Sequence, residues 1–266
     1  ALVDGKKSNF VTNGKWVREA GTVDLYAVWA ANTDTTYTVR HFTQDLNAAK
    51  TGVTNTYSLH STENKTGTSG TVLTLANLKK SITGFTYKEG KVGGTVVATT
   101  TIAVDGSRVI DLYYTRNTGY KLTLTAGTGI DSVSGAGSYP YGATVPINAA
   151  VKAGYTWSKW TGAAQLTAKN TAVTVTANAS YTANATANRY TVTFNPNGGT
   201  VSPTTKGVTF NATYGELPTP TRVGYTFAGW YTARTGGAKV TATTVVKTAA
   251  NHTLYAHWVA RGDTAY

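Results

Sequence analysis

The chain of 266 residues contains 24 basic and 12 acidic residues, which gives a net charge of +12, and it has no cysteine. Without cysteine it can form neither a disulfide nor a CxxC-type zinc or redox site. Its positive charge is spread out, with no basic run longer than a pair such as Lys6-Lys7 or Lys79-Lys80. This pattern argues against a nucleic-acid partner and leaves only a nonspecific attraction to anionic glycans or wall polymers.

The composition and the internal repetition predict a mainly β chain. Seventeen Tyr, six Trp and 28 Gly stand among many Thr and Val residues, a mixture typical of strands and tight turns. Leu25–Trp29 is repeated at Leu254–Trp258, and Ala153–Trp160 is repeated at Val223–Trp230. Repeats at this spacing predict tandem small modules in an elongated array.

Residues 1–35 make up the first module, which we expect to be the C-terminal remnant of a longer unit. Val23, Leu25, Ala27 and Trp29 alternate along the sequence and predict a closing strand with one inward face. The start at Ala1 has no leader-like segment, and no run of about 20 apolar residues could span a membrane. We therefore expect a fragment of a larger extracellular protein, secreted or attached to the cell surface.

Residues 36–117 make up the second module, in which short phrases predict a β-grasp order of strand, strand, short helix and strands. A strand is expected at 37–42 and a closing strand at 108–115, while Leu75, Leu78 and Ile82 have a helix-like spacing. The opening Tyr-Thr-Val, the Gly-Phe-Thr phrase at 84–86 and the closing Leu-Tyr-Tyr-Thr together resemble the mucin-binding-protein (MucBP) type domain of Gram-positive surface proteins. This resemblance implies an α+β, β-grasp-like fold and contact with mucin.

Residues 118–188 make up the third module. A strand is expected at 120–124, followed by a glycine-rich turn at 127–137, a Gly-Tyr-Thr-Trp phrase at 154–157 and a terminal strand at 181–185. The set resembles the divergent form of the internalin B-type repeat. Asn184-Ala185 stands where the related repeat has its closing Trp, so the packing at that end is expected to differ.

Residues 189–260 make up the fourth module, and residues 261–266 are expected to form a tail. Asn195–Gly199 predicts a turn between strands, because Pro fixes φ and Asn-Gly supplies positive φ. Pro218 and Pro220 cannot donate to a ladder and mark a loop or an edge. These features, with Tyr190–Phe194, Gly224–Trp230 and Leu254–Trp258, resemble the internalin B-type (Listeria-Bacteroides) repeat across nearly the whole module. The first module resembles the end of the same repeat.

The sequence offers little for catalysis. The four histidines at positions 41, 60, 252 and 257 are scattered, and no HxxxH, GxSxG or P-loop motif is present. His252 and His257 are five residues apart, which places them on opposite faces of a strand and argues against a metal pair. We therefore predict no enzyme, no catalytic residue, no metal site and no cofactor.

The aromatic residues divide into two predicted groups. Because a module without disulfides needs large core anchors, the recurring aromatic positions are expected to be structural: Trp29, Trp160, Tyr225, Trp230 and Trp258. Trp16 and Trp157 fit the repeat frame less well, so these two are the candidates for exposed glycan or partner binding. The tripeptide Arg261-Gly262-Asp263 is a weak integrin-type motif.

The function expected from these features is a non-catalytic repeat region of a secreted or wall-attached bacterial surface protein. Its modules would act as a stalk with adhesive contacts to host glycoprotein, mucin or cell-wall polymer. The alternative is a structural protein whose modules bind neighbouring modules or copies of the chain and build a fibre or sheath, the first module being completed by strand donation. A third alternative is an accessory module that holds a catalytic domain near polysaccharide.

Overall fold

The computed structural model describes residues 27–46 and 56–262, together with the backbone of four two-residue strands before them. These strands form two antiparallel pairs: β1 (Leu2–Val3) with β2 (Lys6–Lys7), and β3 (Val11–Thr12) with β4 (Lys15–Trp16). The chain divides into two compact units, residues 1–116 and residues 117–266. In the described part of the chain no helix is long and apolar enough to cross a bilayer.

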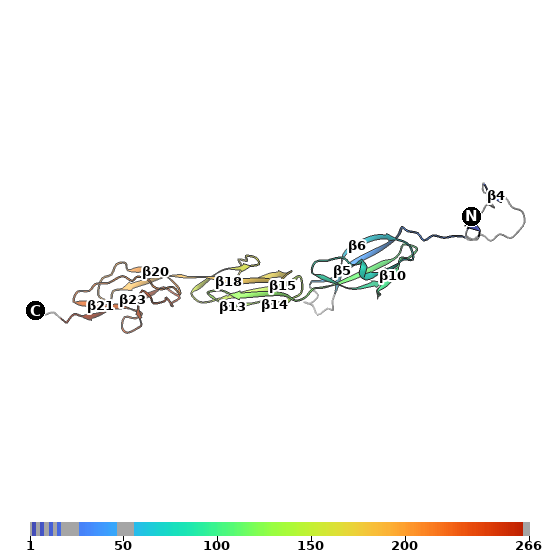
Figure 1. Ribbon diagram of the computed structural model, residues 1–266. Coiled ribbons are helices and arrows are strands. Elements are labelled where there is room, and N and C mark those ends of the chain that lie inside the picture. The colour runs from blue at the N-terminus through green and yellow to red at the C-terminus, as the bar shows by residue number, and fades with distance from the viewer. Residues whose placement is uncertain are drawn as a thin grey trace. The chain divides into compact units, whose positions relative to one another are not determined.

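The second module is a five-stranded sheet in the order β6-β5-β11-β8-β9, with β7 and β10 paired separately (Figure 1). A 3-10 helix, η2 (Leu75–Leu78), follows β7. The strands are β5 (Thr35–Gln44), β6 (Tyr57–Gly67), β7 (Val72–Thr74), β8 (Phe85–Val92), β9 (Thr95–Val96), β10 (Thr99–Thr101) and β11 (Val109–Arg116).

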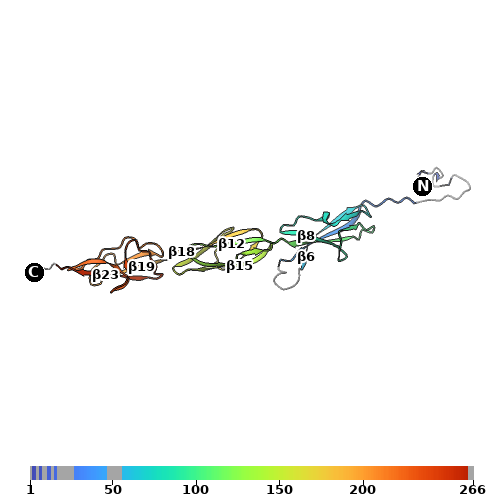
Figure 2. The ribbon, with the colours of Figure 1, turned by 60° about the horizontal axis from the view of Figure 1, so that its bottom comes forward.

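The third module has two sheets, one in the order β14-β12-β18-β16 and one in the order β13-β15-β17 (Figure 2). Alternating buried residues on β12, β15, β17 and β18 form one apolar core, with Trp160 and Ile147 fully buried in it. The strands are β12 (Tyr120–Ala126), β13 (Ile130–Ser134), β14 (Gly137–Tyr139), β15 (Ala143–Val151), β16 (Tyr155–Gly162), β17 (Thr171–Val175) and β18 (Ala179–Ala187).

The fourth module is a five-stranded sheet in the order β20-β19-β23-β21-β22. Its long connections lie over the sheet, and Tyr214 and Val246 from these connections join the core formed by Phe194, Trp230 and Leu254. The strands are β19 (Arg189–Asn195), β20 (Thr205–Thr209), β21 (Tyr225–Tyr231), β22 (Lys239–Val240) and β23 (His252–Ala260).

The three described modules share one pairing scheme around their first and last strands. In each, the first strand pairs parallel with the last strand and antiparallel with an earlier one, which is the second strand in the second and fourth modules and the third strand, β14, in the third module. The last strand also pairs antiparallel with a strand that begins at the aromatic residue of a Gly-aromatic-Thr phrase. The parallel pairs are β5 with β11, β12 with β18, and β19 with β23. In each module the register between the last strand and its antiparallel partner strand shifts at the same point. On the partner strand the shift lies directly after Tyr87, Trp157 and Phe227. The expectation of a mainly β chain of small modules in tandem is confirmed.

Two predicted elements differ from the structure. The helix expected around 71–80 is a strand of three residues followed by a single 3-10 turn, because Lys79 returns to extended backbone with ψ 147°. The strand expected to close the first module is absent over 27–30, where the described backbone has no regular structure. Residues 17–26, which include the rest of that predicted strand, lie outside the described residues.

Candidate interaction surface

A turn and a short bridge build one end of the fourth module. The chain leaves β19 through Asn197 and Gly198, whose φ angles are 47° and 93°, and the backbone N–H of Asn197 donates to the Asn195 side chain at 2.9 Å. Beyond the turn, Thr200 and Thr221 exchange two backbone hydrogen bonds of 2.8 and 2.9 Å. The turn predicted at Asn195–Gly199 is therefore present, and it places the segment before β21 beside the turn.

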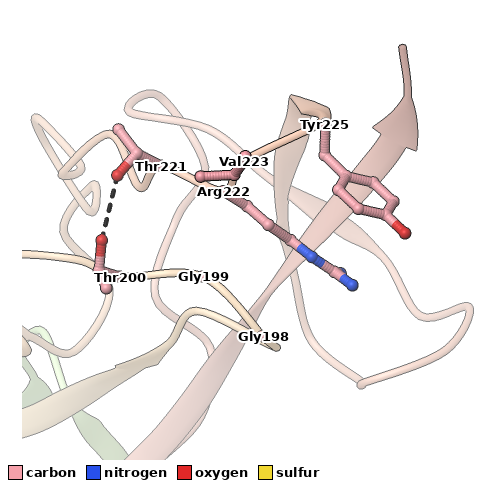
Figure 3. Close-up of a pocket in the computed structure, with 7 residues that line it drawn as sticks. All are labelled: Gly198, Gly199, Thr200, Thr221, Arg222, Val223 and Tyr225. Carbon is pink, nitrogen blue, oxygen red and sulfur yellow. Dashed lines mark hydrogen bonds between the residues drawn. The ribbon is translucent and has the colours of Figure 1, made fainter. Parts of the chain in front are cut away.

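A hollow of about 590 Å³ lies between these two segments (Figure 3). The Arg222 guanidinium lies over the Tyr225 ring at 3.9 Å, and its Nη1 donates to the Asn197 carbonyl at 3.2 Å. Val223 is 99% exposed beside them. The other lining residues are Gly198, Gly199, Thr200 and Thr221. An aromatic ring, a cation and an exposed apolar side chain in one place suit a binding surface and contain no acid–base pair for catalysis.

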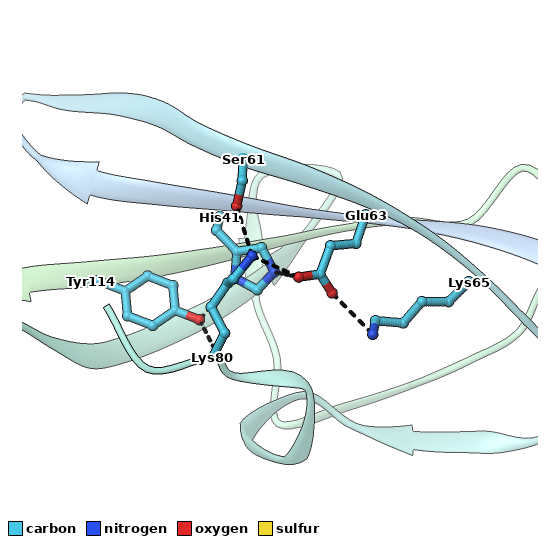
Figure 4. A network of polar contacts seen from close by, with 6 residues as sticks. All are labelled: His41, Ser61, Glu63, Lys65, Lys80 and Tyr114. Atoms are coloured by element: carbon cyan, nitrogen blue, oxygen red, sulfur yellow. Dashed lines mark hydrogen bonds and ion pairs between the residues drawn. The ribbon is translucent and has the colours of Figure 1, made fainter. Parts of the chain in front are cut away.

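A second notable cluster is a charged network in the second module (Figure 4). Glu63 accepts from Lys80 at 2.8 Å and from Lys65 at 2.9 Å, and these two lysines hold the pKa of its carboxyl at about 2. His41 is 0% exposed, and its Nδ1 lies 2.8 Å from the Tyr114 hydroxyl. Its Nε2 lies 3.6 Å from Glu63, too far for a good hydrogen bond.

This network is closed to solvent on its histidine side. Burial lowers the pKa of His41, so the imidazole is neutral near pH 7. The Tyr114 hydroxyl also accepts from the backbone N–H of Lys80 at 3.1 Å, which leaves its own proton for His41 Nδ1. Because both rings are buried, no substrate can reach them, and the arrangement fixes η2 and its exit against the sheet.

The predicted structural anchors fall into different environments. Trp160 and Trp230 are buried, and Trp258 packs against the edge of the fourth core with its Nε1 donating to the Pro196 carbonyl at 2.9 Å. Tyr225 is half-buried and lines the hollow. The prediction for Trp29 is wrong, because its side chain is 89% exposed and no strand in the described residues around it provides a face to pack on.

The candidate Trp157 also needs a correction. Its ring packs against the third core, lies 5.7 Å from the Trp160 ring, and donates from Nε1 to the Thr167 carbonyl at 2.7 Å. It pairs across the sheet with Ala185, as Phe227 pairs with Trp258 in the fourth module. Trp157 therefore does fit the repeat frame, at the position that Phe227 holds in the fourth module.

The remaining predicted residues are only partly described. Trp16 belongs to β4, but its side chain lies outside the described residues, as does Asp263. Arg261 is exposed, with its backbone N–H donating to the Gly224 carbonyl at 3.0 Å, and Gly262 is exposed beside it. The integrin-type motif therefore stays a prediction.

The two histidines of the fourth module each have a separate partner. His252 Nε2 lies 2.7 Å from the Tyr214 hydroxyl, while His257 stacks on Tyr231 at 3.9 Å and contacts the Ala233 carbonyl at 3.0 Å. Among the residues that the structure describes, no group of three or more His, Asp or Glu side chains could hold a metal ion.

Sequence reasoning missed Arg222, and it missed the aromatic turn residues Tyr141 and Phe210. Each of these two residues precedes one with positive φ, Gly142 and Asn211. An aromatic residue before Gly or Asn at the same place in two modules was the available signal.

Comparison with known families assigns the two C-terminal modules. Residues 190–257 match the Listeria-Bacteroides repeat domain, and residues 120–189 match the divergent InlB B-repeat domain. Repeats of this kind occur in secreted or surface proteins of bacteria, and neither match is to an enzyme family. The resemblance of these two modules to internalin B-type repeats is thereby confirmed, and the mucin-binding-type resemblance of the second module stays a prediction.

A particular relative supports the same assignment. Internalin H of Listeria monocytogenes serovar 1/2a (strain ATCC BAA-679 / EGD-e) is 39% identical over 117 residues, which cover 41% of this chain and 20% of internalin H. The chain thus spans about a fifth of the length of this relative.

Proposed function

We propose that the chain is a non-catalytic repeat region of a secreted or wall-attached bacterial surface protein, in which β-grasp-like modules act as a stalk that bears mechanical load. The observation that carries the proposal is the parallel pairing of first and last strands in each described module. Parallel neighbours place the entry and the exit of the chain at opposite ends of one sheet. Each module can therefore add a strand length of roughly 25 Å to a stalk.

The same pairing determines how tension acts on a module. Pulling on the two ends of β19 and β23 loads their hydrogen bonds along the strand direction, so these bonds must break together. An antiparallel pair pulled from adjacent ends opens one bond after another. The strand order thus supports a load-bearing role, and it also supports the β-grasp-like assignment, since the second and fourth modules have the order second, first, last, third and fourth strand.

Adhesion is the second part of the proposal. The similarity to internalin H motivates a contact with the host surface, and the resemblance of the second module motivates mucin as its partner. The net charge of +12 motivates contact with a wall polymer. Trp157 is half-buried against the third core, which leaves only part of its ring for such a contact. A glycan array probed with the full chain tests this part by itself.

Single-molecule pulling tests the stalk. The chain has no cysteine, so engineered cysteines alone decide where force is applied. Pulled between positions 189 and 260, the fourth module is expected to unfold in one step that releases about 220 Å of chain, at a high force. The matched control pulls the same module between Arg189 and Thr209, which pair at the open end of the β19–β20 hairpin, and it should open at a much lower force.

Equal forces in the two directions would contradict the load-bearing stalk. Light scattering of the full chain over a concentration series addresses the alternative of a fibre or sheath, since steady growth in mass with concentration would favour self-assembly over a stalk.

A further inference from the structure

We propose that the exposed end of the fourth module, formed by Arg222, Val223, Gly224 and Tyr225, is a docking surface for the aromatic turn of a further module of the same type joined behind Arg261. The inference extends the proposed stalk, because it describes how one module is fixed to the next. It rests on an internal comparison, since the third module carries the same surface with its partner in place.

At the end of the third module the surface is covered. Gly154 is buried with a φ of 83°, and a Cβ placed on it would lie 2.5 Å from Phe210 Cδ1. The Tyr155 and Phe210 rings meet edge to face at 5.5 Å and 84°. Edge-to-face pairs of this kind stabilise contacts beyond the area they bury. The aromatic turn of the fourth module is therefore fixed against the end of the third.

The residue between these two modules completes the contact. The backbone N–H of Asn188 donates to the Gly154 carbonyl at 2.9 Å, and the Asn188 carbonyl accepts from the backbone N–H of Phe210 at 2.9 Å. Its side-chain Oδ1 accepts from the Thr156 hydroxyl at 2.5 Å. Asn188 thus ties the exit of one module to the entry of the next.

The fourth module repeats the receiving half of this arrangement. Arg261 stands where Asn188 stands, with its N–H donating to the Gly224 carbonyl at 3.0 Å and its Nε to the Thr226 hydroxyl at 3.4 Å. Gly224 has a φ of 76°, close to that of Gly154, but it is exposed, and in the described part of the chain no atom beyond its two sequence neighbours lies within 4 Å of a Cβ placed on it. The hollow in Figure 3 lies beside this uncovered position.

The docking half is also repeated. In the third module Tyr141 occupies the place of Phe210, and its backbone N–H donates to the Asn117 carbonyl at 2.8 Å. Each of these aromatic residues precedes a residue with φ between 63° and 73°, which turns the chain back at the same point. A module of this type therefore brings one aromatic turn at its entry and one glycine-tyrosine surface at its exit.

The test extends the full chain by a second copy of residues 189–260 placed directly after Arg261. The original chain is labelled with ¹⁵N and the copy is ligated to it unlabelled, so that only the original chain is observed by NMR. We expect the amide signals of Gly224 and Tyr225 to shift, and amide exchange in β21 and β23 to slow by about 2- to 10-fold, the range that an edge-to-face aromatic pair provides.

Two variants of the copy make the result specific. Phe210→Ala in the copy should abolish both effects, and Phe210→Tyr, which supplies the residue type found at position 141, should retain them. Phe210 is half-buried and lies outside the fourth core, so the alanine variant is expected to fold, which circular dichroism of the extended chain checks.

The junction between the third and fourth modules gives the internal control. In the original chain, Phe210→Ala should shift the signals of Gly154 and Tyr155. If it does and ligation of the copy changes nothing at Gly224, the docking inference is wrong while the stalk can stand. Shifts at Gly224 caused by free mucin-type glycans, or by added unlabelled full chain, without any effect of ligation would identify a different occupant and would also overturn it.

Discussion

The second and fourth modules share the strand order of their five-stranded sheets, but the same part of the core is filled from the sheet in one and from the covering segment in the other. In the fourth module Trp230 on β21 is buried opposite Ala256 on β23. At the same register in the second module, Gly90 on β8 lies opposite Leu112 on β11, and Leu75 from η2 fills the space above the glycine.

This exchange shows what the fold requires at that position. The core needs a fixed volume between the sheet and the segment that covers it, and either side can supply this volume. In the fourth module Trp230 fills this volume from the sheet, and its Nε1 donates to the Pro218 carbonyl of the covering loop at 2.8 Å. In the second module the sheet has Gly90 at this position, so the volume is filled by Leu75 from the covering segment. The Gly-aromatic-Thr phrase is recognisable in all three modules. The position five residues after its aromatic residue is not, because it is Gly90 in the second module and Trp230 in the fourth.

The largest expected effect comes from removing the Trp230 side chain, which fills the core from the sheet. Trp230→Ala should destabilise the fourth module by about 3–5 kcal/mol, because it leaves a cavity and an unpaired Pro218 carbonyl. Hydrogen exchange of peptides from residues 189–260, followed in urea, measures the loss. Trp29→Ala removes an indole of the same size from an exposed position and should change the unfolding free energy by less than about 0.5 kcal/mol. Similar losses in both variants would mean that the burial of Trp230 is wrong.

Much of this architecture could be predicted from the sequence. The repeated phrases located the strands of the third and fourth modules, because aromatic and β-branched residues alternate there between turn residues. The placement of Trp157 outside the repeat frame was wrong, because its cross-strand partner is the small Ala185, and this pairing is visible only when the register is known.

The remaining features depend on contacts between distant residues. The spacing of Leu75, Leu78 and Ile82 predicted a helix, but only Leu75 is fully buried, and it packs on Gly90 instead of forming one stripe of a longer helix. The hollow beside Arg222 could not be predicted either. Whether the Gly-Tyr end of a module is covered depends on the module that follows, and the same phrase is covered at Gly154 and open at Gly224.

A smaller effect is expected from adding a side chain at Gly90 in the second module. A Cβ on Gly90 would lie 2.9 Å from Leu75 Cβ, so Gly90→Ala should destabilise the second module by about 1–3 kcal/mol through overpacking. Leu75→Ala alone should cost about 2–5 kcal/mol through the cavity it leaves. If the two residues share one space, the double variant should lose less than the sum of the single losses, as measured by urea unfolding with exchange of peptides from residues 56–116. Strict additivity would contradict the exchange of volume between sheet and η2.

The smallest expected effect is a pH dependence of the stability of the second module, caused by its buried His41. Burial lowers the pKa of His41 in the folded chain below the value of about 6.5 that it has when unfolded. The carboxylate of Glu63 opposes this shift, whereas the charges of Lys80, Lys65 and His60 add to it. Above pH 6.5 the imidazole is neutral in both states. As the pH falls below 6.5, the unfolded chain takes up the proton first, so the free energy of unfolding decreases until the folded pKa is passed.

Exchange of peptides from residues 56–116 between pH 7.5 and pH 5 should therefore show this module losing stability on acidification, after correction for the intrinsic exchange rate. His41→Gln should flatten this dependence, and His60→Gln, at an exposed position on the neighbouring strand, should change it far less, because His60 is the smallest of the named contributions to the shift. If His41→Gln lowers stability at every pH but keeps the slope, another group titrates. A flat profile in the unaltered chain would mean that Glu63, 3.6 Å from Nε2, already compensates the burial of the ring.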